Sequence, residues 1–251
     1  RYINGFPDQP PARTGISLGD TLGGMFAAQG ILSALYWRDT RGEGRGQVVD
    51  VSLVESCFSM LESIAPEYDR LGLVREASGT NLRGIAPSNL FRSRDDKWVV
   101  IAANQDTLFR RLCSAMGQPD LADDPRFATH AERGKNQQEI EGLVAEWASH
   151  RDASELDQLL REAGVVCGPV HTIAEVFEDP HFRARGMLET HYDPEIGPFL
   201  GPGVVPSLSE TPGSVRWTGP WEPGAHNQEI FQGLLGLKEE ELERLSERGV
   251  I

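Results

Sequence analysis

The spacing of hydrophobic residues changes several times along the chain, and each change predicts a different element. Residues 16–39 are apolar around most of a helical surface, which predicts a buried helix capped by Asp20 or Thr21. The small residues at positions 23, 24, 27 and 28 indicate that another element packs closely against it. Beyond a glycine turn, residues 47–53 alternate and are rich in Val, which predicts a buried strand before a helix at 54–64. This order of elements suits an α/β layer domain.

A second, compact set of elements comes after Pro66, which we expect to end the first. Strand-like runs at 88–93 and 97–104 flank a short polar turn and predict a β-hairpin. Amphipathic patterns predict helices at 105–117, 132–150 and 152–164. Asp152 is the expected cap of the last of these helices, and Gly164 its stop. A short strand at 165–172 and a helix over 173–188, broken near Pro180, complete the set.

The same pattern divides the chain into units and linkers. We expect a first portion over 1–65, a linker over 66–87, a small domain over 88–192 and a second linker over 193–225. The second linker is rich in Pro and Gly. Two helices at 227–236 and 238–249 fill the last portion, 226–251.

Composition narrows the classes of partner. The 251 residues carry 38 acidic against 24 basic side chains, a net charge of −14. So much negative charge repels nucleic acid and anionic membrane, so neither is an expected partner. Three scattered cysteines, Cys57, Cys113 and Cys167, fit neither a disulfide framework nor a zinc site and indicate a reducing, cytoplasmic location. The chain lacks an initial Met, and its first fifteen residues have the composition of an internal loop, so we expect a preceding part.

Catalytic motifs are few when the residues are taken alone. Neither a phosphate-binding glycine loop nor a GxSxG motif occurs, and no two of the six histidines have the i,i+4 spacing of metal ligands. Asp20 and Glu55 open helices, where a carboxylate is usually structural. Gln105 follows a strand, a common position for site residues, but it is also ordinary at a helix start. The residues alone therefore indicate an α/β protein without identifying a reaction.

The order of several longer motifs is more specific. Residues 15–56, beginning GISLGDTLGGMFAAQG, resemble the family III CoA-transferases, a family that also includes alpha-methylacyl-CoA racemase. The resemblance continues in order through GIAPSNLFRSRDDKWVVIAAN, DPRFATHAERGKNQQEIEGLVAEW, LLREAGVVCGPVHTIAEVFEDPHFRARGML, GVVPSLSETPG and the final RGVI. It therefore covers essentially the whole chain.

This resemblance implies a fold and a chemistry. The fold would have a large Rossmann-like domain, formed here in part by both 1–65 and 226–251, and a small α+β domain over 88–192, with two subunits interlocked as a homodimer. The substrates would be a coenzyme A thioester (acyl-CoA) and a small carboxylic acid, with no metal. In the family an aspartate attacks the acyl-CoA carbonyl to form a mixed anhydride, which CoA thiolate converts to an aspartyl-CoA thioester. The acceptor carboxylate then completes the exchange.

The resemblance also assigns site residues. The family aspartate lies in a Gly-Tyr-Asp-like motif that this sequence lacks, so we expect it upstream and expect this chain alone to be inactive. A loop that closes over the active site in the family corresponds to 79–84, which implies roles for Gly79, Asn81, Arg83 and Gly84. Asn81 could hydrogen-bond an acid substrate and Arg83 could pair with its carboxylate; the alternative is a solvent-facing arginine in a plain linker. Gln105 corresponds to an acid of the racemase branch, and its amide cannot ionise, which favours transfer.

Two alternatives stay open at this point. An acyl-CoA racemase or epimerase would need a His/Asp acid–base pair on either side of the alpha carbon, mainly upstream. A non-catalytic subunit of a heteromeric transferase would instead stabilise an active partner.

Overall fold

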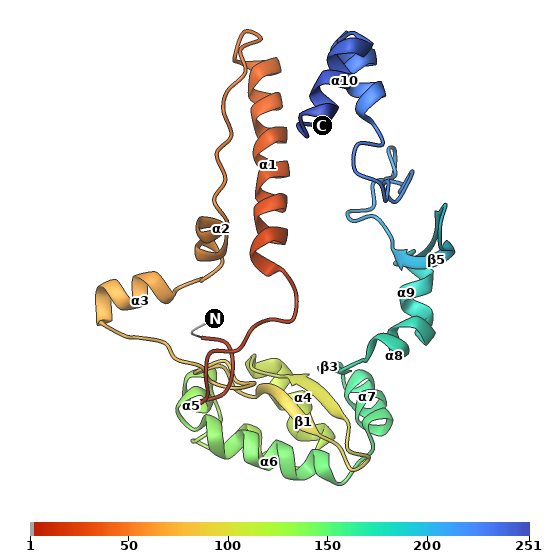
Figure 1. Cartoon of the computed structure of the whole chain (residues 1–251). Helices are drawn as coiled ribbons and strands as arrows, with labels where there is room; N and C mark the ends of the chain where they lie inside the picture. Colours follow the sequence, from red (N-terminus) through yellow and green to blue (C-terminus); the bar gives the residue numbers. More distant parts are fainter. Residues whose placement is uncertain (1–2) are drawn as a thin grey trace. The chain divides into compact units, whose positions relative to one another are not determined.

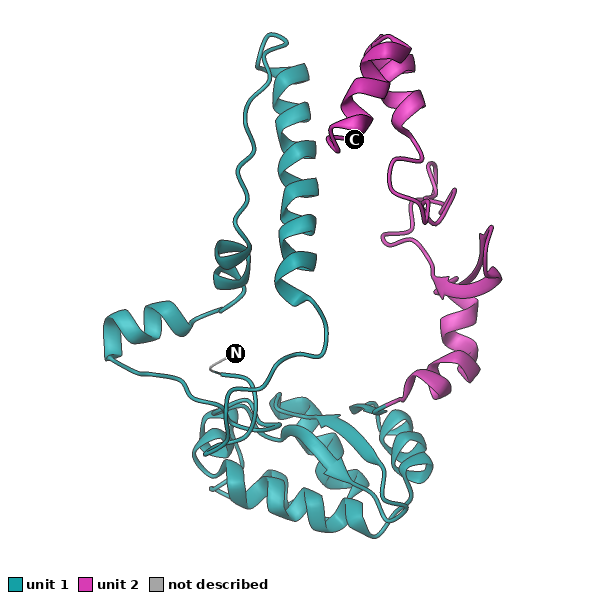
Figure 2. Ribbon diagram, in the orientation of Figure 1, with its two compact units in different colours: residues 1–170 teal, residues 171–251 magenta. Residues whose placement is uncertain are grey.

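The structure is a computed structural model that describes residues 3–251 (Figure 1). Contacts between residues divide the chain into two compact units, Arg1–Val170 and His171–Ile251 (Figure 2). Across the described residues, no helix combines the length and apolar character that crossing a bilayer requires.

The first unit begins with the long helix α1 (Leu18–Thr40) and the short helix α2 (Leu53–Ser59). A Cβ at Gly23 would lie 2.5 Å from Leu53 Cδ2, and one at Gly30 would lie 2.7 Å from Val49 Cγ1. The expected close packing against small residues of this helix is therefore confirmed at Gly23. The helix starts earlier than predicted, with Ser17 rather than Asp20 at the N-cap position.

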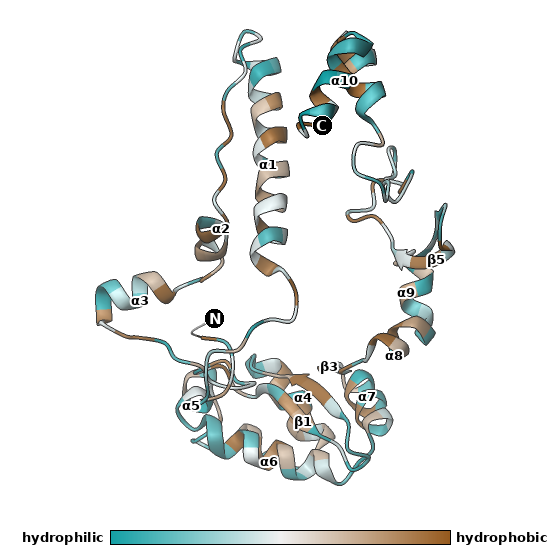
Figure 3. Cartoon of the chain, in the orientation of Figure 1, coloured by the Kyte–Doolittle hydropathy of each residue, from teal (hydrophilic) through white to brown (hydrophobic). Residues whose placement is uncertain are grey.

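Two predictions for this region are wrong. Residues 47–52 run beside α1 but form no strand, because no neighbouring strand in the described part of the chain supplies a hydrogen-bonded ladder. The predicted buried helix is largely uncovered: only Gly23 of α1 is buried, and Leu32 is 68% exposed. Apolar residues lie along much of α1 and the adjacent segment (Figure 3).

The predicted first linker contains a helix. Helix α3 (Ile64–Leu71) includes Pro66 in its first turn, where a missing backbone N–H removes no helical hydrogen bond. Pro66 therefore does not end the preceding elements as expected. The helix stops at Gly72, whose φ of +63° is left-handed.

A three-stranded antiparallel sheet forms the centre of the first unit. Strands β1 (Ser88–Arg92) and β2 (Trp98–Ala102) confirm the predicted hairpin, and β3 (Val166–Pro169) pairs with the other edge of β2. Val99 and Ile101 are fully buried, whereas Trp98 and Val100 are exposed. One face of β2 therefore packs on the core while the other is uncovered.

Four helices and a short turn of 3₁₀-helix complete this unit. They are α4 (Asp106–Ala115), the 3₁₀ turn η1 (Pro119–Ala122), α5 (His130–Lys135), α6 (Gln137–Ser149) and α7 (Ala153–Glu162). Leu112, Val144 and Leu156 pack with the sheet in one core cluster. The single helix predicted over 132–150 is divided at Asn136, whose amide instead donates to backbone oxygens.

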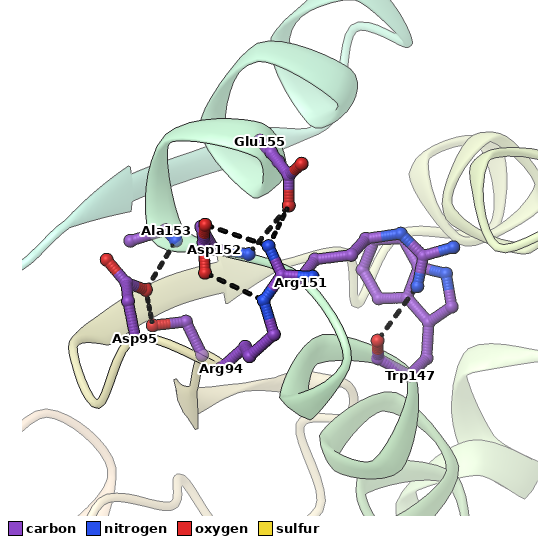
Figure 4. A network of polar contacts seen from close by, with 8 residues as sticks. Arg94, Asp95, Trp147, Arg151, Asp152, Ala153 and Glu155 are labelled. Atoms are coloured by element: carbon purple, nitrogen blue, oxygen red, sulfur yellow. Dashed lines mark hydrogen bonds and ion pairs between the residues drawn. The ribbon is translucent and has the colours of Figure 1, made fainter.

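The start of α7 is fixed to the hairpin turn. Asp152 forms the predicted cap, as a capping box with Glu155, and Gly164 follows the helix with a φ of +68°. The carboxylate of Asp95 accepts from the backbone N–H of Ala153 at 2.8 Å (Figure 4). Arg94 donates to both oxygens of Asp152, at 3.0 and 2.8 Å. These contacts hold the turn between β1 and β2 against the helix.

The second unit begins with two short helices and a hairpin. Its elements are α8 (Ile173–Glu178), α9 (Pro180–Ala184), β4 (Leu188–Asp193), β5 (Gly197–Pro202), the π-helix η2 (Gln228–Leu234) and α10 (Glu239–Glu247). The predicted break at Pro180 is confirmed. Strand β5 pairs with β4 inside the region predicted as a linker, 193–225.

Candidate functional site

The loop between α3 and β1 contains four of the five predicted site residues. Gly79 and Gly84 have φ values of +70° and +78°, a backbone conformation that favours glycine. The N–H of Gly79 donates to the carbonyl of Gly5 at 2.9 Å, and the hydroxyl of Ser78 donates to the carbonyl of Asn81 at 2.6 Å. The two glycines therefore set the turns at each end of the loop, and its interior is held by local hydrogen bonds.

Asn81 and Arg83 line one cleft. This cleft has a volume of about 450 Å³ and is bounded by residues from the amino-terminal segment, α3, the loop and α6. Arg75 also lines it, and its guanidinium donates to Glu67 (Nε to Oε2, 2.7 Å) and to Ser63 (2.8 Å). The structure thus brings two arginines and the side-chain amides of Asn81 and Gln137 together at one opening.

The two arginines are in different electrostatic states. Hydrogen bonds from Arg75 and then Ser63 lower the pKa of Glu67 to about 2, and the charge of Arg83 adds to this effect. Arg75 is therefore neutralised by a carboxylate that stays ionised. Arg83 is exposed and makes no hydrogen bond within the described part of the chain. Its guanidinium therefore has hydrogen-bonding capacity left for an anion at this cleft.

Polar side chains behind the loop connect it to α6. The side-chain oxygen of Gln137 accepts from the N–H of Gly84 at 3.0 Å. Asn89, on β1, donates to both Asn81 and Glu141. Burial raises the pKa of Glu141, and the hydrogen bonds from Gln137 and Asn89 partly offset this rise.

Gln105 lies apart from the cleft. It occupies the N-cap position of α4 with an extended backbone, makes no side-chain capping hydrogen bond and is exposed. It is not among the residues that line the cleft. The buried Arg133 relates the two segments, because it donates to the carbonyl of Ala86, after the loop, and to that of Asn104, before Gln105.

Sequence reasoning missed Arg75, Arg133, Gln137 and Glu141. Gln137 and Glu141 have the i,i+4 spacing of one helix face, but the same spacing is common among exposed polar residues. No signal in the sequence separates them from their neighbours. Their role depends on which segment packs against α6.

Thiol and metal chemistry receive little support from the geometry. Burial raises the pKa of both Cys113 and Cys167 to about 11, and Asp157 adds to the rise at Cys167. Both thiols are therefore protonated near neutral pH and are poor nucleophiles. Over residues 3–251, no three His, Cys, Asp or Glu side chains gather as a metal site requires.

Comparison with known proteins finds relatives that are named as CoA-transferases. The chain is 48% identical to a succinyl-CoA–D-citramalate CoA-transferase of Chloroflexus aurantiacus over all 251 residues. It is 38% identical to the alpha subunit and 34% identical to the beta subunit of a succinyl-CoA–L-malate CoA-transferase of that bacterium. The chain spans 62%, 58% and 62% of these three relatives.

Two solved structures resemble this chain in fold over most of its length. A CAIB/BAIF family protein from Brucella suis is 30% identical and superposes with a TM-score of 0.70 over 92% of this chain and 59% of its own. A Mycobacterium tuberculosis protein at 23% identity shares the fold with a TM-score of 0.76, over 90% of this chain and 57% of its own. The sequence model of one protein family, CoA-transferase family III, matches residues 1–227. The chain therefore belongs to CoA-transferase family III.

Proposed function

We propose that the chain is the carboxyl-terminal part of a CoA-transferase that moves CoA between an acyl-CoA thioester and a carboxylic acid. The observation that carries the proposal is the match, over all 251 residues of this chain, to relatives that are named CoA-transferases. The covalent carboxylate in this proposal is an aspartate upstream of these residues. This chain would then supply substrate contacts and be inactive alone.

We propose a short dicarboxylic acid as the acceptor. The names of the relatives above specify citramalate and malate, and a Streptomyces avermitilis relative, 32% identical over 262 residues, is named a formyl-CoA:oxalate CoA-transferase. All three acids carry two carboxylates on a short carbon chain. The cleft beside the loop supports this choice, because Arg83 has free hydrogen-bonding capacity for one carboxylate. Asn81 would add an amide donor, and Gly79 and Gly84 would give the loop its conformation. Gln105 would contribute from the other segment of the site.

The larger architecture belongs to the same proposal. Residues 1–65 and 226–251 would form part of a Rossmann-like large domain, and 88–192 the small domain, with linkers at 66–87 and 193–225. Two such subunits would interlock as a homodimer. The exposed apolar side chains of α1, among them Met25 and Leu32, support a covering partner surface.

Transfer is favoured over racemisation by two observations. Gln105 carries an amide, which cannot serve as an acid or base, and the relatives reported above are named as transferases. A non-catalytic role is the second candidate function. One pair of relatives forms the alpha and beta subunits of a succinyl-CoA–L-malate CoA-transferase, and this chain matches both.

The test of the activity uses the full-length protein. It is incubated with succinyl-CoA together with one acid, citramalate, malate or oxalate, in three separate reactions. New CoA thioesters are then separated by liquid chromatography. Transfer to at least one acid is the expected result. If no acid accepts CoA from the protein alone, but exchange appears after co-expression with a second family subunit, the non-catalytic role is favoured.

The test of the site compares two arginines. Arg83→Ala should raise the KM for the acid about tenfold to hundredfold, the equivalent of the ~1.5–3 kcal/mol of a charged hydrogen bond, and leave the KM for acyl-CoA unchanged. Arg70→Ala removes an equal charge from the end of α3, outside the cleft, and should change neither value. An unchanged KM for the acid in Arg83→Ala would show that the loop is only a linker.

A further inference from the structure

Gln137 holds the loop through both ends of its side-chain amide. Its oxygen accepts from the N–H of Gly84 at 3.0 Å, and its nitrogen donates to the carbonyl of Leu82 at 3.1 Å. The same nitrogen donates to Glu141 Oε1 at 3.0 Å. These three partners fix the orientation of the amide, with its nitrogen toward Leu82 and Glu141 and its oxygen toward Gly84. One side chain thus satisfies a donor and an acceptor two residues apart in the loop.

Glu141 also positions the side chain of Asn81, through Asn89. Glu141 is only 6% exposed as a residue, and the other oxygen of its carboxylate accepts from Nδ2 of Asn89 at 3.0 Å. Asn89 also donates to the side-chain oxygen of Asn81. With its oxygen occupied in this way, the Asn81 amide keeps two N–H donors that make no hydrogen bond within residues 3–251. These donors are available at the cleft.

The backbone of the loop also packs closely on α5. A Cβ placed on Gly134 would lie 2.6 Å from the carbonyl oxygen of Gly84, so the helix and the loop meet with no side chain between them. Gly134, Gln137 and Glu141 follow one another along α5 and α6. Together they form a continuous support for residues 81–84.

We propose that Gln137 and Glu141 are positioning residues, which hold the loop and the Asn81 amide in the conformation that binds the acid substrate. This inference rests on the proposed role of the loop in acid binding. On this basis the loop is a binding segment that hydrogen bonds from α6 hold in one conformation. Neither residue transfers a proton or forms a covalent bond; both act through Asn81 and the backbone of residues 82–84.

The first experiment compares neighbouring glutamines in the full-length protein. Gln137→Ala removes all three hydrogen bonds of the amide, whereas Gln138→Ala removes an exposed side chain from the same turn of α6. Hydrogen–deuterium exchange in a peptide covering 78–87 should become about fivefold to tenfold faster in Gln137→Ala, the effect of losing roughly one net hydrogen bond of stabilisation. Exchange in Gln138→Ala should match the unaltered protein.

Kinetics then separate a functional role from a structural one. In Gln137→Ala the KM for the acid should rise about fivefold to tenfold, in line with the same lost stabilisation, while the KM for acyl-CoA stays unchanged. Gln137→Glu is the second variant: it keeps the acceptor for Gly84 but loses the donor to Leu82 and faces Glu141 with a like charge. It should fail to restore either the exchange rate or the KM for the acid.

Three outcomes decide the matter. Unchanged exchange in Gln137→Ala, or full recovery in Gln137→Glu, would overturn the positioning role. Faster exchange with an unchanged KM for the acid would support the conclusion that Gln137 holds the loop, but it would refute acid binding by the loop. Faster exchange together with a raised KM for the acid, and no effect in Gln138→Ala, would support both.

Discussion

Arg133 connects the two segments of the candidate site, and its replacement has a calculable effect. The side chain is fully buried, and its guanidinium donates to the carbonyl oxygens of Ala86, Phe127 and Asn104 at 3.1, 2.8 and 2.7 Å. It also donates to Asp106 Oδ1 at 2.7 Å. A single cation therefore satisfies backbone acceptors from the loop end, from the strand end and from the segment before α5.

Arg133→Met keeps much of the apolar length and removes every donor. The carbonyls of Ala86 and Phe127 then lose the partner described above, and each unpaired buried group costs about 1–3 kcal/mol. Asn104 keeps a partner, because Nδ1 of His130 lies 2.9 Å from its carbonyl oxygen. Removing a buried charge returns part of its desolvation cost. We expect a net loss of about 3 kcal/mol in the free energy of unfolding, between these opposing effects.

The assay is urea unfolding of the chain followed by far-ultraviolet circular dichroism. With a slope of about 1–3 kcal/mol per molar urea, the midpoint should fall by about 1–3 M. Arg110→Met is the matched control, because Arg110 makes an exposed ion pair with Asp123 at 2.9 Å, and such pairs contribute at most about 1 kcal/mol. Equal midpoints for the two variants would refute the argument that the buried guanidinium joins the two segments.

Two further predictions concern packing and pH. Gly134→Ala places a methyl group against the carbonyl of Gly84 and should lower the free energy of unfolding, measured in urea, by about 1 kcal/mol, since the clash outweighs the better helix propensity of Ala. Gly142→Ala, with open space around it, should instead stabilise by about 0.5–1 kcal/mol, and the same sign in both variants would contradict the proposed contact. Burial opposes ionisation of Asp193, but hydrogen bonds to its carboxylate outweigh burial and lower its pKa to about 2. The contribution of the ionised Asp193 to the free energy of unfolding should therefore be complete above about pH 4 and be lost as the pH falls toward 2. The thermal midpoint should show this drop, and Asp193→Asn should flatten it; an unchanged profile in that variant would count against the assignment.

Local rules account for the parts of the fold that the sequence predicted well. The hairpin of β1 and β2, the capping box at Asp152 and the helix break at Pro180 each depend on residues within a few positions of one another. The strand predicted at 47–53 failed for the opposite reason. Its alternation of Val and polar residues describes a surface to be buried, but a strand also needs a hydrogen-bonded neighbour, which the segment itself does not supply.

The candidate site divides in the same way. Gly79, Asn81, Arg83 and Gly84 were singled out together, because the motif around them resembles a family loop. The structure adds that both glycines have left-handed backbone, a conformation that favours glycine. Arg75 was not identifiable, since nothing in the sequence places it beside Arg83.

By itself the sequence determined the family and those local elements, such as the β1–β2 hairpin and the cap of α7, that depend on motif order and on short-range backbone preferences. Only the tertiary structure decided that Gln137, 53 positions after Gly84, would hold that loop from behind. Helix α6 packs against β1, and this packing brings Glu141 within hydrogen-bonding distance of Asn89. A side chain of α6 carries no local sign of which distant segment it will meet, because that meeting depends on how the apolar faces of helix and sheet are buried together.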